Sequence, residues 1–124
     1  MDLAPRRFAD TLILSPRGRI DHATWESFKA ALWPELATCA AGQDRVVLDL
    51  SGLDYISSAG LRVLLLASRE VKPRGGEVAV ASLTAVVREI FDISRFSAIF
   101  PMFPTVREAV AAGSPGALAA FDAA

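Results

Sequence analysis

The sequence contains one cysteine, Cys39, and one histidine, His22, among its 124 residues. A single cysteine cannot form an internal disulfide, and one residue of each type does not supply the ligands of a zinc site. The chain also lacks the glycine-rich loops G-x-x-x-x-G-K-[ST] and G-x-G-x-x-G that cradle nucleotide phosphates. We therefore expect no metal and no cofactor, and the cysteine usage fits a reducing cytoplasm.

The chain has neither a strong net charge nor a long apolar run. Its formal net charge of −1 does not predict a nucleic-acid or membrane-surface partner. The longest apolar run, "VLLLA", is far shorter than the about 20 residues that span a bilayer. The N-terminal "MDLAPRRFAD" has no apolar segment typical of a secretory signal. These absences predict a cytoplasmic protein without membrane insertion.

What the chain does have is enough apolar material for one core. Hydrophobic residues make up 52% of the sequence, which suffices for a sizeable core at this length. We predict a single domain over residues 1–124, with its core at about 8–112. The small-residue tail, 113–124, is expected to be frayed or to form a weakly packed extra turn.

Apolar patterns alternate between the strand period and the helix period along the chain. The predicted strands cover 8–15, 18–20, 45–50, 77–82 and 98–103, and the predicted helices cover 21–42, 57–72, 84–94 and 104–113. This order predicts an α/β fold, with a single mixed sheet of about four to five strands and about four flanking helices. The turn at Pro16 and Gly18 predicts that the first two strands are antiparallel, and Pro34 predicts a break near Trp33.

Two serines, Ser57 and Ser58, stand where an apolar segment passes into the helix at 57–72. A serine at a helix start commonly caps the free backbone N–H groups. The same N–H groups and the helix dipole also suit a phosphate. Phosphate on Ser58 would add about −1.5 to −2 charges without unfolding the helix. Asp21 and Thr24, before the first helix, are expected to cap it or, as an alternative, to contact a partner.

The helix at 57–72 carries more apolar residues than one packed face requires. Its expected sheet-facing residues are Leu61, Leu64, Leu65, Ser68 and Val71, while Val63, Leu66 and Ala67 fall on other faces. Neighbouring helices could bury that excess, or it could be exposed for docking with Arg62 and Arg69 at its border.

A serine hydrolase is a weak third interpretation. Ser58, His22 and Asp21 could be written as a catalytic triad. However, the turn reads S-S-A-G and not G-x-S-x-G, and adjacent side chains at a helix start point in different directions. We therefore expect no enzymatic activity.

Three segments together resemble the STAS domain family, in particular the stand-alone bacterial anti-sigma factor antagonists. They are "GRIDHAT", "VVLDLSGLDYISSAGLRVLL" and the stretch from "GGEVAVAS" to "PTVREAV". The second segment is similar to the family signature, a strand followed by [Y/F]-[I/M]-D-S-[S/T]-G-L. The resemblance extends over about residues 8 to 112.

The resemblance implies a regulatory switch that binds proteins. In the family, the unphosphorylated antagonist binds an anti-sigma factor that is also a serine kinase of the histidine-kinase-like ATPase type. Phosphorylation of the antagonist releases it, and a PP2C-type phosphatase reverses the modification. The motif places the acceptor at Ser58. The implied partner-binding residues are Asp21, Thr24, Ser57, Ser58, Gly60 and Arg62.

The sequence departs from the signature at two positions. Ser57 replaces the family aspartate and Ala59 replaces the second Ser/Thr. Ser57 is therefore an alternative acceptor. The family also implies an alternative function, an accessory subunit of a lipid transporter ATPase that is not phosphorylated.

Overall fold

The computed structural model describes all residues from 1 to 124 and contains a mixed five-stranded sheet. Its strand order is β1-β2-β4-β6-β7, so β4 lies in the middle. The strands are β1 (Arg6–Phe8), β2 (Thr11–Leu14), β4 (Arg45–Asp49), β6 (Val78–Ala81) and β7 (Met102–Phe103). Only β1 and β2 pair antiparallel, and the other pairs are parallel. The predicted α/β fold with a mixed sheet is confirmed.

The first predicted strand, 8–15, is in fact the β1–β2 hairpin. Phe8 pairs with Thr11, and the chain turns through Ala9 and Asp10 between them. Ala9 has a φ of 53°, a left-handed conformation that sequence patterns associate with glycine or asparagine. The turn contains neither glycine nor asparagine, so the sequence pattern did not indicate a hairpin. The prediction of one continuous strand was therefore wrong.

The second predicted strand is present as β3 (Gly18–Ile20), but its predicted antiparallel pairing with the preceding strand is wrong. Instead, β3 pairs parallel with β5 (Leu53–Ile56), a strand that was not predicted, in a separate two-stranded sheet. Gly18, with a φ of 81°, starts β3, and its N–H donates to Gly52 O at 2.8 Å. The turn therefore carries the chain out of the main sheet and does not fold it back.

The predicted helices are present with corrected ends. They are α1 (Trp25–Leu32), α2 (Ser58–Val71), α3 (Ala85–Ile93) and α4 (Val106–Ala111), with short 3-10 turns η1 (Trp33–Leu36), η2 (Lys72–Arg74) and η3 (Phe96–Ala98). Pro34 lies in η1, which confirms the predicted break near Trp33, and the helical stretch ends at Leu36, before the predicted Gly42. None of the helices is long and apolar enough to cross a membrane.

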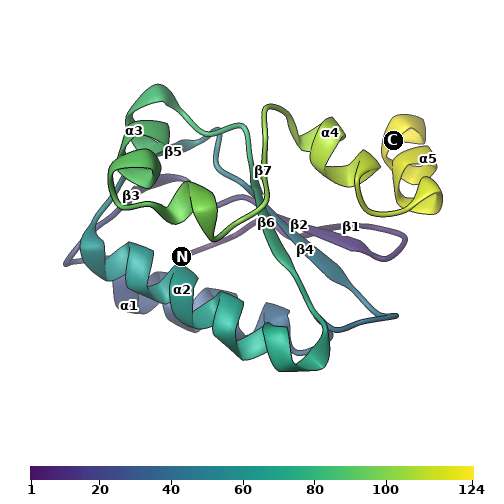
Figure 1. The fold of residues 1–124 in the computed structure, drawn as a ribbon, viewed down its shortest axis with the longest axis horizontal. Helices are drawn as coiled ribbons and strands as arrows, with labels where there is room; N and C mark the ends of the chain where they lie inside the picture. Colours follow the sequence, from purple (N-terminus) through teal and green to yellow (C-terminus); the bar gives the residue numbers. More distant parts are fainter.

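The main sheet separates two cores (Figure 1). Helices α1, α2 and α3 cover one face, and α4 and α5 (Pro115–Ala123) cover the other. Val47 and Leu48 of β4 are both fully buried and belong to opposite cores, which confirms that β4 is a central strand buried on both faces.

The predicted buried face of α2 needs correction. Val63 and Ala67, expected on other faces, are buried, whereas Leu65 and Ser68 are only half-buried. The reason is that α2 packs against α1 as well as against the sheet, so its buried surface is wider than one stripe.

The C-terminal tail forms α5, so the prediction of a frayed or weakly packed segment was wrong. Ser114 caps the helix by accepting the Ala117 N–H at 3.1 Å. The Phe121 ring meets Phe8 of β1 edge-on at 5.3 Å between centroids. The Ser–Pro pair that begins α5 is itself a helix-start signal, because serine suits the cap and proline the first turn.

Candidate functional site

The two serines at the start of α2 have different environments. Ser57 is the N-cap residue, and its Oγ accepts the Gly60 N–H at 3.3 Å. The Ser57 N–H donates to Ile20 O at 2.8 Å, which ties the start of α2 to β3. Ser58 is the first residue of the helix, is exposed, and its hydroxyl makes no hydrogen bond within the protein. Of the two hydroxyls, only that of Ser58 is free.

Gly60 fixes how closely α2 approaches the β3–β5 sheet. A Cβ at this position would lie 2.6 Å from Ile20 Cγ2 and 2.7 Å from Ile56 Cγ1. Real carbon contacts are about 3.5–4.0 Å, so no larger residue fits without displacement. Gly60 is buried, and it therefore supports the site by setting its geometry and offers no side chain to a partner.

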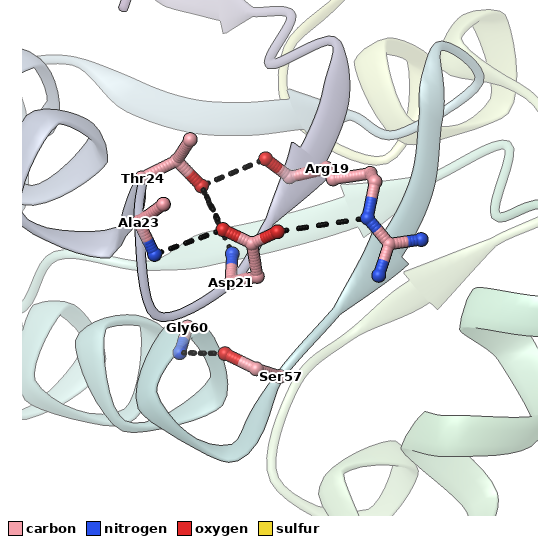
Figure 2. A network of polar contacts seen from close by, with 6 residues as sticks. All are labelled: Arg19, Asp21, Ala23, Thr24, Ser57 and Gly60. Atoms are coloured by element: carbon pink, nitrogen blue, oxygen red, sulfur yellow. Dashed lines mark hydrogen bonds and ion pairs between the residues drawn. The ribbon is translucent and has the colours of Figure 1, made fainter.

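The segment after β3 forms a polar network close to Ser57 (Figure 2). The Asp21 carboxylate accepts the Ala23 N–H at 3.0 Å, and the Asp21 N–H donates to Thr24 Oγ1 at 2.9 Å. The Thr24 hydroxyl lies 2.8 Å from Arg19 O. Thr24 occupies the N-cap position of α1, but its side chain accepts no N–H of that helix. The expected capping of α1 by Asp21 or Thr24 is therefore wrong, because both side chains bond within the loop.

Asp21 also orients an arginine. The Ala23 N–H bonded to its carboxylate, aided by Thr24 and Arg19, holds the pKa of Asp21 below its ordinary value. Arg19 Nε lies 3.6 Å from Asp21 Oδ2, and the guanidinium stacks over the Tyr55 ring at 4.4 Å from the centroid. The Arg19 side chain thus stays exposed while two neighbours on β5 and the loop limit where it can lie.

These elements enclose a shallow hollow of about 270 Å³ beside Ser58. We call it the serine hollow, and its lining residues are Arg19, Asp21, His22, Tyr55, Ser57, Ser58 and Ala59. It combines the free hydroxyl of Ser58, the guanidinium of Arg19 and the first turn of α2, and that turn has no acidic residue. A helix N-terminus and a guanidinium favour an anion in general, whereas the Asp21 carboxylate that also lines the hollow repels one.

The structure brings together three of the expected site residues, Asp21, Ser57 and Ser58, on the serine hollow. Thr24 lies behind them in the loop network, and Arg62 lies on a neighbouring groove. Sequence reasoning missed Arg19 and Tyr55. Their pairing depends on the register between β3 and β5, where Arg19 lies opposite Tyr55, and β5 itself was not predicted.

A catalytic triad is not assembled at the serine hollow. His22, Asp21 and Ser58 all line it, but the His22 imidazole makes no hydrogen bond to either of the others. The Asp21 carboxylate instead contacts Ala23, Thr24 and Arg19. A triad needs the base bonded to both the nucleophile and the orienting carboxylate. The geometry thus gives no support to the hydrolase interpretation.

A family model described as the STAS domain matches residues 3–109. The chain belongs to the STAS domain family. The β3–Asp21–Thr24 loop and the serine turn, described above from their geometry, both lie within the matched region.

Related proteins of the family are small regulators. BtrV of Bordetella bronchiseptica, provisionally described as an anti-sigma factor antagonist, is 42% identical over 118 residues, which cover 95% of this chain and 98% of BtrV. Among solved structures, TM1081 of Thermotoga maritima, also provisionally described as an anti-sigma factor antagonist, superposes with a TM-score of 0.79 at 22% identity over 89% of this chain and 92% of that protein. Both are similar to this STAS protein along nearly their whole length.

The anti-sigma factor antagonist SpoIIAA shares the fold. Its unphosphorylated form superposes with a TM-score of 0.69 at 20% identity, covering 86% of this chain and 90% of SpoIIAA. A Bacillus SpoIIAA has also been solved in a phosphorylated form, with a TM-score of 0.65 at 18% identity over 89% of this chain and 97% of that one. The STAS fold therefore accommodates a phosphorylated antagonist.

Proposed function

We propose that this STAS protein is an anti-sigma factor antagonist controlled by phosphorylation of Ser58. In its unphosphorylated form it binds an anti-sigma factor that is also a serine kinase of the histidine-kinase-like ATPase type. Phosphorylation of Ser58 dissociates the antagonist from the kinase, and a PP2C-type phosphatase restores the form that binds. The protein itself performs no catalysis in this cycle.

The observation that carries the proposal is the difference between the two serine hydroxyls. A kinase needs an accessible hydroxyl that can leave its hydrogen bonds. Ser57 Oγ is held by the Gly60 N–H, whereas Ser58 Oγ is exposed and unbonded at the edge of the serine hollow. Ser58 is therefore favoured over Ser57 as the acceptor.

The start of α2 also supports a phosphate without loss of fold. Its first turn has no acidic residue, so a phosphate on Ser58 meets the positive end of the helix dipole and no adjacent carboxylate on the helix. The Arg19 guanidinium lines the same hollow and contributes positive charge there. The modification would then act on partner binding through bulk and charge, with little change in folding stability.

The departure at Ser57 is compatible with this mechanism. Aspartate and serine are both strong N-cap residues, and Ser57 caps α2 by accepting the Gly60 N–H. Replacing the family aspartate by serine therefore keeps the capping function and removes one negative charge next to the acceptor. We expect the partner kinase of this protein to recognise Ser58 without a negative charge at position 57.

The proposal is tested by phosphorylation in vitro. The purified protein is incubated with ATP and, one at a time, with the histidine-kinase-like ATPases encoded in the genome from which it comes. Mass spectrometry should map phosphate to Ser58, Ser58→Ala should accept none, and Ser57→Ala should be phosphorylated. Phosphate on Ser57 alone, or on neither serine with any of these kinases, would overturn the proposal.

A further inference from the structure

A groove between α1 and α2 lies next to the serine hollow and is not explained by phosphorylation. We call it the α1–α2 groove. It has a volume of about 380 Å³, and its lining residues are Trp25, Lys29, Ala59, Arg62, Val63 and Leu66. Four of these are apolar, and two are cations, one from each helix.

We propose that the α1–α2 groove docks an acidic, amphipathic segment of the partner kinase, in which an apolar side chain is flanked by carboxylates. The apolar side chain packs on Trp25 and Leu66, and the carboxylates meet Lys29 and Arg62 on the two walls. This inference rests on the proposed function, because it names the same partner.

The charges of the groove select an acidic occupant. Neither Lys29 nor Arg62 is in an ion pair, although the whole chain has a net charge of only −1. Glu26 does not line the groove, although it lines a neighbouring hollow together with Trp25 and Lys29. Two unpaired cations on either side of an apolar floor favour an anionic partner and disfavour a basic one.

The residue types also fit a protein partner. Trp25 and Lys29 of α1 and Trp33, the first residue of η1, are spaced four residues apart, and Lys29 Nζ lies 5.1 Å from the centroid of the Trp33 ring. Both tryptophans are only half-buried. Half-exposed tryptophan and arginine beside an apolar floor are the residue types that dominate binding energy at protein interfaces.

The groove and the serine hollow are adjacent. Ala59 lines both, and it follows Ser58 directly in the chain. A segment docked in the α1–α2 groove at Ala59 would therefore lie close to the phosphate acceptor. The groove would supply affinity and selectivity for the kinase, whereas Ser58 would act as the switch.

The test measures docking and phosphorylation separately. The kinase that phosphorylates Ser58 is titrated in a calorimeter, with ADP bound, against wild type and against Lys29→Glu/Arg62→Glu. We expect the charge reversal to weaken binding at least about ten-fold at low salt, with a smaller loss at high salt. In kinase assays KM for the variant should rise similarly, while kcat stays near that of wild type, because Ser58 is intact.

A matched control uses Lys72→Glu/Arg95→Glu, which makes the same change in charge at exposed positions that are in no ion pair and lie outside both the groove and the serine hollow. It should bind within about two-fold of wild type. Circular dichroism verifies that each variant is folded. If the double reversal does not fold, Lys29→Gln and Arg62→Gln are tested singly, with an expected loss of about three-fold each.

Four results would overturn the docking site. Wild-type affinity in the folded charge-reversal variant would remove the groove from the interface and leave Ser58 regulation standing. If the charge-reversal variant keeps its kinase affinity but loses a dimer that wild type forms in sedimentation, the groove binds a second copy of the chain. If it keeps its kinase affinity but loses binding to phosphatidylglycerol vesicles, the groove binds lipid. If wild type is neither bound nor phosphorylated by any kinase, the proposed function fails, and the docking site fails with it.

Discussion

Replacing Gly60 by alanine tests how α2 is seated on the β3–β5 sheet. The new Cβ would lie 2.6 Å from Ile20 Cγ2 and 2.7 Å from Ile56 Cγ1, about 1 Å closer than a normal carbon contact. Both isoleucines are buried, with at most 1% of their surface exposed, and β-branched side chains have few alternative rotamers. Neither can move away without cost.

Two opposing effects set the size of the change. Alanine is favoured over glycine inside a helix by about 1 kcal/mol. Overpacking a filled core costs about 1–3 kcal/mol, and two clashes with stiff neighbours place this site at the upper end. We therefore expect Gly60→Ala to lower the free energy of unfolding by about 2 kcal/mol.

The assay is urea unfolding followed by circular dichroism, with Gly116→Ala as the matched control. Gly116 is also in the first turn of a helix, but a Cβ there meets nothing within 4 Å. The same substitution should therefore stabilise the protein there, by up to about 1 kcal/mol. A Gly60→Ala protein as stable as wild type would refute the close packing that positions Ser58.

Three further substitutions test separate contacts. Ser57→Ala should lower the free energy of unfolding by about 1 kcal/mol, because the helix loses its cap. An equal loss of stability in Ser58→Ala would contradict the capping role of Ser57. Thr11→Val should raise it by about 1 kcal/mol, because the Thr11 hydroxyl is buried without a partner, and a loss of stability would show that it has one. Asp21 has a pKa lowered mainly by the Ala23 N–H, so its ionised form stabilises the fold above the unfolded pKa of about 4, and this contribution disappears as the pH falls through the folded pKa. Stability should therefore fall more steeply between about pH 5 and pH 3 in wild type than in Asp21→Asn, and equal slopes in urea titrations would contradict this.

The order of strands and helices could be predicted because long apolar patterns dominate it. The central strand β4 has an almost continuous apolar sequence, and α2 combines a cap with a long apolar pattern. Short elements were harder. The four residues of β5 include Asp54, and the hydrophobic residues Tyr55 and Ile56 are adjacent, so the strand is too short and too irregular to show the alternation typical of a strand.

Pairing was less predictable than the elements themselves. The turn before β3 contains proline and glycine, which indicate a turn but not its direction, and β3 leaves the main sheet to pair with a distant strand. The candidate acceptor could be located from the signature, but the different roles of Ser57 and Ser58 depend on one hydrogen bond, from the Gly60 N–H. Sequence spacing alone does not decide which hydroxyl makes that bond.

The switch is tested most directly by comparing the affinity of the partner kinase for unphosphorylated protein and for protein phosphorylated on Ser58. Calorimetric titration should show a loss of about 30- to 1000-fold on phosphorylation, equivalent to about 2–4 kcal/mol. Ser58→Asp should lose part of that affinity, since it carries one charge and less bulk, whereas Ser58→Ala should keep most of it. Equal affinity for the two forms of the wild-type protein would contradict control through Ser58.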